Sequence, residues 1–205
     1  RGFSHWSTVL LDIAGVAYTL PTHTLPSARS PEPVSTMVKP SAAIFPLMIN
    51  AHSETAILLS SQKGYGFVAQ FEALVSRNKA GKKVLNLGSS YIADILTLSA
   101  DTETIALVSQ QGRLLIIPLS DIPMLNKGKG NKLIQIHGKD IEANTDSLVY
   151  IKALSKDAAL ILHSGKRFFK LTPKDQAAYL GSRGQRGVLL PRGYRRVTSA
   201  EVEGL

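Results

Sequence analysis

Basic residues in this chain gather beside glycines in short loops. Residues 127–132 read KGKGNK, with three lysines and no acid, and residues 77–83 hold four basic residues and no acid. Between residues 166 and 196 there are nine Lys or Arg against one acid, Asp175. Glycines let backbone amides approach a phosphate together with basic side chains. The pattern therefore predicts a surface for a polyanion, with the expected contact residues Arg77, Lys79, Lys82, Lys83, Lys127, Lys129, Lys132, Lys166, Arg167, Arg183 and Arg186.

The positive charge is distributed unevenly. The formal net charge is +9 and the sequence pI is near 9.8, yet residues 84–111 hold three acids and no Lys or Arg. A single lysine-rich turn is explained by protection of a sheet edge. Basic loops at one phase in three repeats, followed by a basic tail, favour nucleic acid instead. The loop at residues 28–34 carries only Arg29, beside Glu32, so we expect it to bind weakly.

The loops belong to a pattern that occurs four times in the sequence: an apolar run, a glycine turn, a second apolar run, a short polar element and a loop. The turn glycines lie 49, 48 and 53 residues apart and are Gly15, Gly64, Gly112 and Gly165. A period near 50 residues admits four strands per unit, as in propeller blades. Apolar runs of four to eight residues that end at glycine favour buried strands over helices.

These patterns predict an all-β fold in which four-stranded antiparallel blades form a propeller-like disc. Strands are expected at residues 8–11, 16–20, 56–59, 65–69, 104–108, 113–117, 132–136, 148–154, 159–162 and 167–171. Helix should be limited to short turns near Glu72, Asp121 and Asp175, the last with Thr172 as its N-cap and Pro173 as its first residue. One domain should span residues 1–196, with repeats near 8–50, 56–100, 105–154 and 160–190, and residues 197–205 should form a C-terminal tail.

The residues give little support to other kinds of site. The chain has no cysteine and its five histidines show no ligand-pair spacing, so neither a disulfide framework nor a metal site is expected. The glycines after residue 63 fit a loose dinucleotide fingerprint, but no parallel βαβ unit follows them. The loop at 127–132 lacks the ending of a Walker motif. Because no nucleophile, base and carboxylate can be assembled from local spacing, we expect no catalytic residue and no cofactor in this domain.

The apolar stretches are also too short to span a membrane. Residues 42–49 form one of the longest and contain a proline. Residues 8–20 have the length of a signal-peptide core, but Asp12 interrupts them and they align with the later repeats. We therefore interpret them as strand sequence, and the chain, which does not begin with Met, as a C-terminal fragment.

Four segments of the chain resemble a known family. They are similar to the C-terminal domain of the A subunit of bacterial DNA topoisomerase IV, in a family that includes the gyrase A C-terminal domain. The resemblance extends to about Arg196, and the segments are GVAYTLPTHTLPSAR (15–29), GYGFVAQFEALVSRNKAGKKV (64–84), GRLLIIPLSDIPMLNKGKGNKLI (112–134) and GKRFFKLTPKDQAAYLGSRGQRG (165–187).

The resemblance implies a β-pinwheel, in which neighbouring blades exchange strands and duplex DNA lies around a basic rim. It implies a non-catalytic domain that bends DNA and positions it for strand passage in decatenation and supercoil relaxation. Cleavage would occur elsewhere in the enzyme, and ATP and Mg would act through other domains. The expected partners are duplex DNA and, in a heterotetramer, the rest of the A subunit together with the ATPase B subunit. The isolated fragment is expected to be monomeric, without membrane insertion, and the enzyme to lie in the bacterial cytoplasm at the nucleoid.

Two departures from the family pattern bear on this expectation. The seven-residue basic box of gyrase A domains is absent, since residues 184–187 hold only a fragment of it, which favours topoisomerase IV over gyrase-type wrapping. Only four repeats are evident, whereas members of this family have five or six blades. The alternatives are a gyrase-type DNA-wrapping domain and a propeller-like module that binds a protein partner. The latter would need an exposed apolar or aromatic patch.

Overall fold

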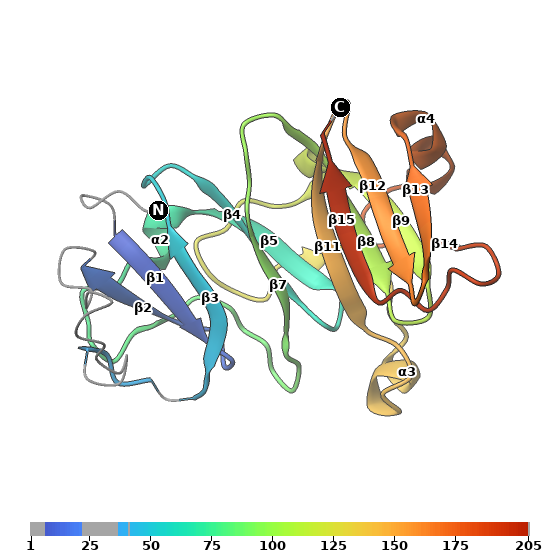
Figure 1. The fold of residues 1–205 in the computed structure, drawn as a ribbon. Coiled ribbons are helices and arrows are strands. Elements are labelled where there is room, and N and C mark those ends of the chain that lie inside the picture. Colours follow the sequence, from blue (N-terminus) through green and yellow to red (C-terminus); the bar gives the residue numbers. More distant parts are fainter. Residues whose placement is uncertain (1–6, 22–36, 41, 205) are drawn as a thin grey trace.

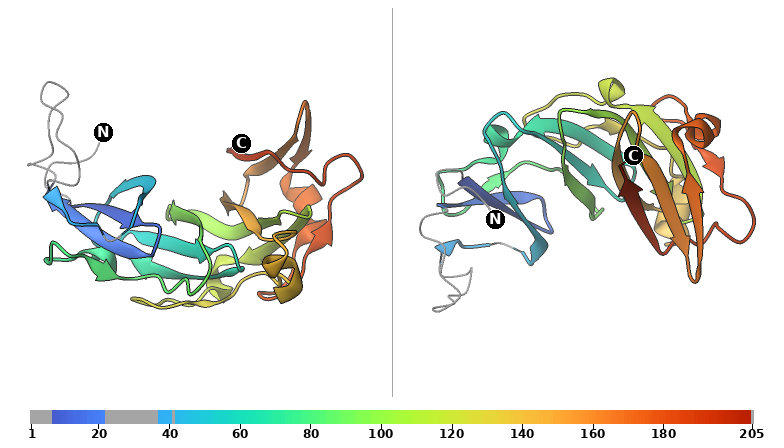
Figure 2. Two further views of the ribbon diagram at one scale, coloured as in Figure 1. Left: turned by 90° about the horizontal axis from the view of Figure 1, so that it is seen from below. Right: turned by 45° about the horizontal axis from the view of Figure 1, so that its top comes forward.

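A computed structural model describes residues 7–21, 37–40 and 42–204 of the chain. It contains four antiparallel β-sheets, arranged in the order of the chain. The sheets lie one after another along a curved arc, with the first and last at its two ends (Figures 1 and 2). The expected all-β architecture is confirmed.

The first sheet has the strand order β3-β1-β2-β6 and consists of β1 (Ser7–Asp12), β2 (Val16–Pro21), β3 (Ile44–Asn50) and β6 (Lys82–Lys83). The second has the order β10-β5-β4-β7 and consists of β4 (Ala56–Ser61), β5 (Tyr65–Gln70), β7 (Ile92–Thr97) and β10 (Asn131–Lys132). The third has the order β11-β8-β9-β14 and consists of β8 (Thr102–Ser109), β9 (Arg113–Pro118), β11 (Leu148–Ser155) and β14 (Val188–Leu189). The fourth has the order β13-β12-β15 and consists of β12 (Ala159–Ser164), β13 (Arg167–Leu171) and β15 (Ser199–Glu203).

Neighbouring sheets exchange strands. The short strands β6, β10 and β14 each follow the central hairpin of one sheet in sequence but pair with the sheet before it. The expectation of a full strand at residues 132–136 was wrong, because only Asn131 and Lys132 pair with β5. Leu133 and Ile134 are instead buried in the core, where both N–H groups point to the carbonyl of Gly64.

The fourth sheet differs from the expected blade because it has three strands instead of four. Its third strand, β15, pairs with β12 over five residue pairs and buries Ala200 against the last core cluster. The expected domain boundary at residue 196 therefore falls inside the segment that completes this sheet.

Helix is confined to short turns. α2 (Phe71–Leu74), η2 (Leu119–Asp121) and α4 (Pro173–Gln176) lie at the three expected positions, and η3 (Ala177–Tyr179) continues α4. Thr172 caps α4 in a capping box with Asp175, as its sequence position predicts. α3 (Gly138–Glu142) was not expected.

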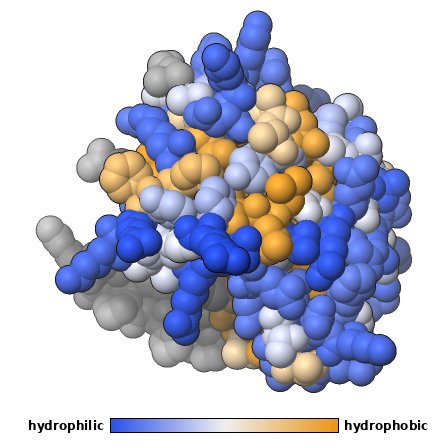
Figure 3. Space-filling model, turned by 90° about the vertical axis from the view of Figure 1, so that its right-hand side faces the viewer, coloured by the Kyte–Doolittle hydropathy of each residue, from blue (hydrophilic) through white to orange (hydrophobic). Residues whose placement is uncertain are grey.

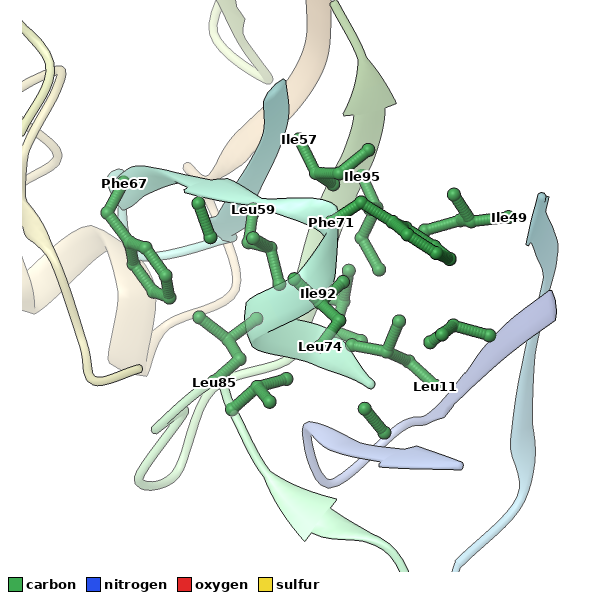
Figure 4. Packing of buried hydrophobic residues seen from close by; sticks show 14 of the residues in the cluster. Leu11, Ile49, Ile57, Leu59, Phe67, Phe71, Leu74, Leu85, Ile92 and Ile95 are labelled. Atoms are coloured by element: carbon green, nitrogen blue, oxygen red, sulfur yellow. The ribbon is translucent and has the colours of Figure 1, made fainter. Parts of the chain in front are cut away.

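Each pair of successive sheets encloses one hydrophobic cluster, and the central strands contribute to two clusters. Ile57 and Leu59 of β4 pack between the first and second sheets, while Leu58 faces the third sheet. Successive side chains of a strand point to opposite faces, so a strand covered on both sides must be apolar at every position. This accounts for the unbroken apolar runs in the sequence. Figure 4 shows the first cluster, in which Phe71 and Leu74 of α2 pack with Leu11 of β1.

Candidate nucleic-acid interface

The basic loops lead directly into the exchanged strands. Each loop ends with a glycine at positive φ, namely Gly81 (φ +78°), Gly130 (φ +79°) and Gly187 (φ +79°). A Cβ on Gly130 would lie 2.1 Å from the carbonyl oxygen of Gly66. These glycines are thus required by the close approach of the exchanged strand to its partner. Gly128, by contrast, has nothing within 4 Å of a Cβ position.

The turn glycines bind the backbone that follows each exchanged strand. The carbonyl of Gly15 accepts hydrogen bonds from the N–H groups of Val84 (3.0 Å) and Leu85 (3.1 Å). The carbonyl of Gly64 accepts in the same way from Leu133 and Ile134 after β10, and the carbonyl of Gly112 accepts one hydrogen bond, from Leu190 after β14. The three basic loops therefore enter three consecutive sheets at equivalent places, which we call the first, second and third exchange junctions.

The first junction carries four of the expected contact residues. Arg77 and Lys79 lie exposed in the loop before β6, and Lys83 is exposed within it. Lys82 is half-buried, and its Nζ donates to the carbonyl of Ala73 at 2.8 Å. Three of the four side chains are therefore free to reach a ligand, while the ammonium group of Lys82 is held by a hydrogen bond within the domain.

The second junction concentrates its charge around an aromatic ring. Lys129 Nζ lies 3.9 Å from the ring centroid of Tyr65, and Lys132 Nζ lies 5.8 Å from it. Lys132 also donates to Oε1 of Gln135 at 3.0 Å, whereas Lys127 is exposed in the loop. Lys129 and Lys132, far from Tyr65 in sequence, meet it through the β5–β10 pairing.

The third junction brings the expected residue Arg186 together with two arginines that the sequence pattern left out, Arg113 and Arg195. Arg113, the first residue of β9, donates from Nη1 to the carbonyl of Gly187 at 3.0 Å. Partial burial, and next the nearby charge of Arg186, lower the pKa of Arg113. The charge of Asp146 opposes this shift, and that of Arg195 adds a smaller lowering effect on the pKa. Arg113 follows its turn glycine directly, as Tyr65 follows Gly64, and that phase is the sequence signal that could have identified it.

The remaining expected residues are divided between two places. Arg183 reaches back to the second junction, where its Nη1 donates to the carbonyl of Lys132 at 3.2 Å. Lys166 and Arg167 are exposed at the hairpin of the fourth sheet. Among the described residues no exchanged strand pairs with β13, so Lys166 and Arg167 do not lie at an exchange junction. Arg29 and its loop lie outside the described residues.

Comparisons with known proteins agree with this architecture. The family model of the DNA gyrase C-terminal domain, a beta-propeller, matches residues 56–97 and 103–155. The solved structure of the E. coli ParC C-terminal domain matches with a TM-score of 0.91 and 34% identity, covering 100% of this chain and 84% of that chain. This chain belongs to the ParC C-terminal domain family.

Relatives of the ParC-type domain are found in longer proteins. The chain is 39% identical over 206 residues to the A subunit of DNA topoisomerase 4 from Pseudomonas aeruginosa, covering 98% of this chain and 27% of that protein. It is 34% identical to the Escherichia coli K12 protein of the same name, again covering 27% of it. The chain thus spans about a quarter of the length of these relatives. A solved gyrase A C-terminal domain, with 14% identity and a TM-score of 0.70, shows the fold alone.

In this ParC-type domain the ion pairs of the described residues lie away from the exchange junctions. Within residues 7–21, 37–40 and 42–204, the ion pairs are Lys170–Glu203 and His163–Glu201, both in the fourth sheet. None of the expected contact residues therefore forms an ion pair with a carboxylate in this part of the chain. The same ranges contain no helix that is long and apolar enough to cross a membrane, and no group of three or more His, Asp or Glu that could hold a metal ion.

Proposed function

We propose that this domain binds duplex DNA along its three exchange junctions and bends it around the arc of sheets. In the intact enzyme it would position that DNA for strand passage by a type IIA topoisomerase, in decatenation and supercoil relaxation. The observation that carries the proposal is the repetition of unneutralised basic residues at one place in three consecutive sheets. A duplex carries one negative charge per about 1.7 Å of its axis, so a repeated row of cations complements it.

The recognition mode follows from the side chains that the junctions present. Lysine and arginine on loops contact phosphates, which fix position without reading sequence. The longest helix within the described residues has five residues, too short to read bases along a major groove. Preference among DNA sites would come from the ease of bending.

The wider assembly belongs to the same proposal. The relatives are named as the A subunit of their enzyme, so the partners would be the rest of such a polypeptide together with an ATPase B subunit, in a heterotetramer. ATP and Mg would act through those other parts. The enzyme would work in the bacterial cytoplasm, at the nucleoid.

A second candidate function is supported by one surface feature. Apolar side chains gather on the face that includes the fourth sheet, between hydrophilic groups (Figure 3). The exposed apolar residues of β13, β14 and the segment joining them to η3 are Phe168, Leu180, Val188 and Leu189. Exposed apolar side chains on this face would suit a module that binds another protein.

A titration with mixed-sequence duplex at several salt concentrations separates the two functions. If six phosphates are engaged, the log–log slope of affinity against salt should be about −5, since each contributes about 0.9. A slope near zero, or no binding, would reject DNA as the ligand and leave the protein-binding module.

A further inference from the structure

The second junction has a cleft that is lined by basic side chains. A cleft of about 300 Å³ opens beside Tyr65, between the turn after β4 and the loop before β10, and α3 closes one side of it. Lys63, Lys129 and Lys132 line it, together with one acid, Glu142. The cleft is thus lined by three cations and one aromatic ring, and two of the cations approach the face of that ring.

Two of these cations share one aromatic ring, and neither forms an ion pair with a carboxylate of the described residues. The ammonium groups of Lys129 and Lys132 both approach the Tyr65 ring, at 3.9 and 5.8 Å from its centroid. Glu142 forms no ion pair with them. Bringing like charges together costs free energy, and a bound oxyanion would remove that cost. The arrangement is therefore suited to a phosphate.

Lys63, in the turn after β4, is the third lysine that lines the cleft. It precedes the turn glycine Gly64, and its Nζ donates to Oγ of Ser89 at 2.8 Å. An ammonium group has three N–H donors, so two remain for a ligand in the cleft. Lys63 lies 14 residues before the nearest expected contact residue, Arg77, and only the fold brings it to this surface.

The equivalent positions at the other junctions are different residues. Where the second junction has Lys63, Tyr65 and Lys132, the first has Ala14, Val16 and Lys83, and the third has Gln111, Arg113 and Leu189. The scaffold is shared, but the combination of an aromatic ring and converging lysines occurs at one junction of the three.

We propose that the cleft around Tyr65 is a discrete phosphate site that anchors one backbone phosphate of the duplex, with Lys63 among its binding residues. The inference rests on the proposed function and specifies where the DNA is held most firmly. Tyr65 acts as a positioning residue, because its ring face holds the two ammonium groups in place before DNA arrives.

The test measures duplex affinity for the 205-residue chain and its variants at about 50 and 200 mM salt. Lys63→Ala should weaken binding, and its disadvantage should shrink about 3.5-fold over that range, because one released counterion contributes about 0.9 to the slope. The matched control is Lys156→Ala, an exposed lysine whose neighbours in a different cleft include Asp101, Glu103 and Asp157. It should bind as the parent does.

Two substitutions of Tyr65 test the positioning role. Tyr65→Phe keeps the ring face and should retain parental affinity, whereas Tyr65→Leu should lose about two- to fivefold. Thermal unfolding of each variant shows that the fold is kept. Should Tyr65→Leu be unfolded, Lys63→Ala still decides the matter.

The outcomes separate the site from the function. If the parent shows no salt-dependent binding, the proposed function itself fails. If the parent binds steeply but Lys63→Ala matches Lys156→Ala, the anchoring site is rejected while DNA binding by the junction loops stands.

Discussion

The N–H of Leu133 donates to the carbonyl of Gly64 at 2.7 Å, across 69 positions of the chain. This bond closes the second exchange junction, and its counterparts close the first and third. The basic loops are therefore held between sheets and do not hang free from one sheet. Stability of the junctions and placement of the charges depend on the same backbone contacts.

Replacing Gly130 by alanine should destabilise the domain. Its φ of +79° costs an L-residue about 1–2 kcal/mol, and the new Cβ would collide with the backbone of Gly66. Gly138→Ala is the control, since nothing lies within 4 Å of its Cβ position. Urea unfolding of both variants measures the difference, and equal midpoints would contradict the assigned junction geometry.

Tyr18→Phe should reduce stability without touching DNA binding. The Tyr18 hydroxyl donates to Oδ2 of the fully buried Asp12 at 2.8 Å, while Oδ1 accepts from the N–H groups of Ala14 and Val16. Removing one donor from a buried carboxylate costs about 1–3 kcal/mol. The free energy of unfolding should fall by this amount while the duplex affinity stays parental. An unchanged free energy of unfolding would show that the Tyr18–Asp12 hydrogen bond does not stabilise the domain.

Lys79 and Lys82 should separate binding from folding, although they are neighbours. Lys79→Ala removes an exposed charge and should weaken DNA binding at constant stability. Lys82→Ala removes the hydrogen bond to the carbonyl of Ala73 and should cost about 1 kcal/mol of stability. Chemical denaturation and DNA titration of both variants check this, and the reverse assignment of effects would be inconsistent with the structure.

Asp94 should make the domain less stable as pH rises. Burial raises the pKa of its carboxyl in the folded state, against smaller opposing effects from the hydrogen bond of Ile95 N–H and the charge of Lys152. The folded state then holds a proton that the unfolded state has released, so stability is lost as pH rises from the unfolded pKa through the folded one. Asp94→Asn should be more stable than the parent at pH 7 and lose this advantage in acid. Unfolding curves across pH would reveal a wrong sign directly.

The sequence predicted the repeated scaffold well because its signal is local. Both faces of β4, β8 and β9 are covered, so these strands appear as apolar runs between glycines. The exchanged strands are two residues long and pair with partners more than 60 positions away, which no local pattern reveals. β15 was taken for a tail because only Ala200 of its residues is buried.

The candidate site likewise contains residues with a local sequence signal and residues that only distant strand pairing brings together. The loop lysines were predicted from composition, and the structure places the three basic loops at equivalent junctions. Lys63, Tyr65 and Arg113 were missed because they lie beside turn glycines, and come near the loops only through strand exchange. The glycines of residues 127–132 were expected to let the backbone approach a phosphate, whereas Gly130 packs against Gly66 in the structure.

The most direct test of the account compares two double variants in a duplex titration over a range of salt. Lys127→Ala/Lys129→Ala removes two exposed charges from the second junction, and Lys156→Ala/Lys174→Ala removes two exposed charges elsewhere. The account predicts that the first double variant binds more weakly for all sequences alike and that its salt slope is shallower by about 1.8, two contacts at about 0.9 each. The second should keep the parental slope. Equal slopes for the two double variants would show that the exchange junctions are not the surface that holds DNA.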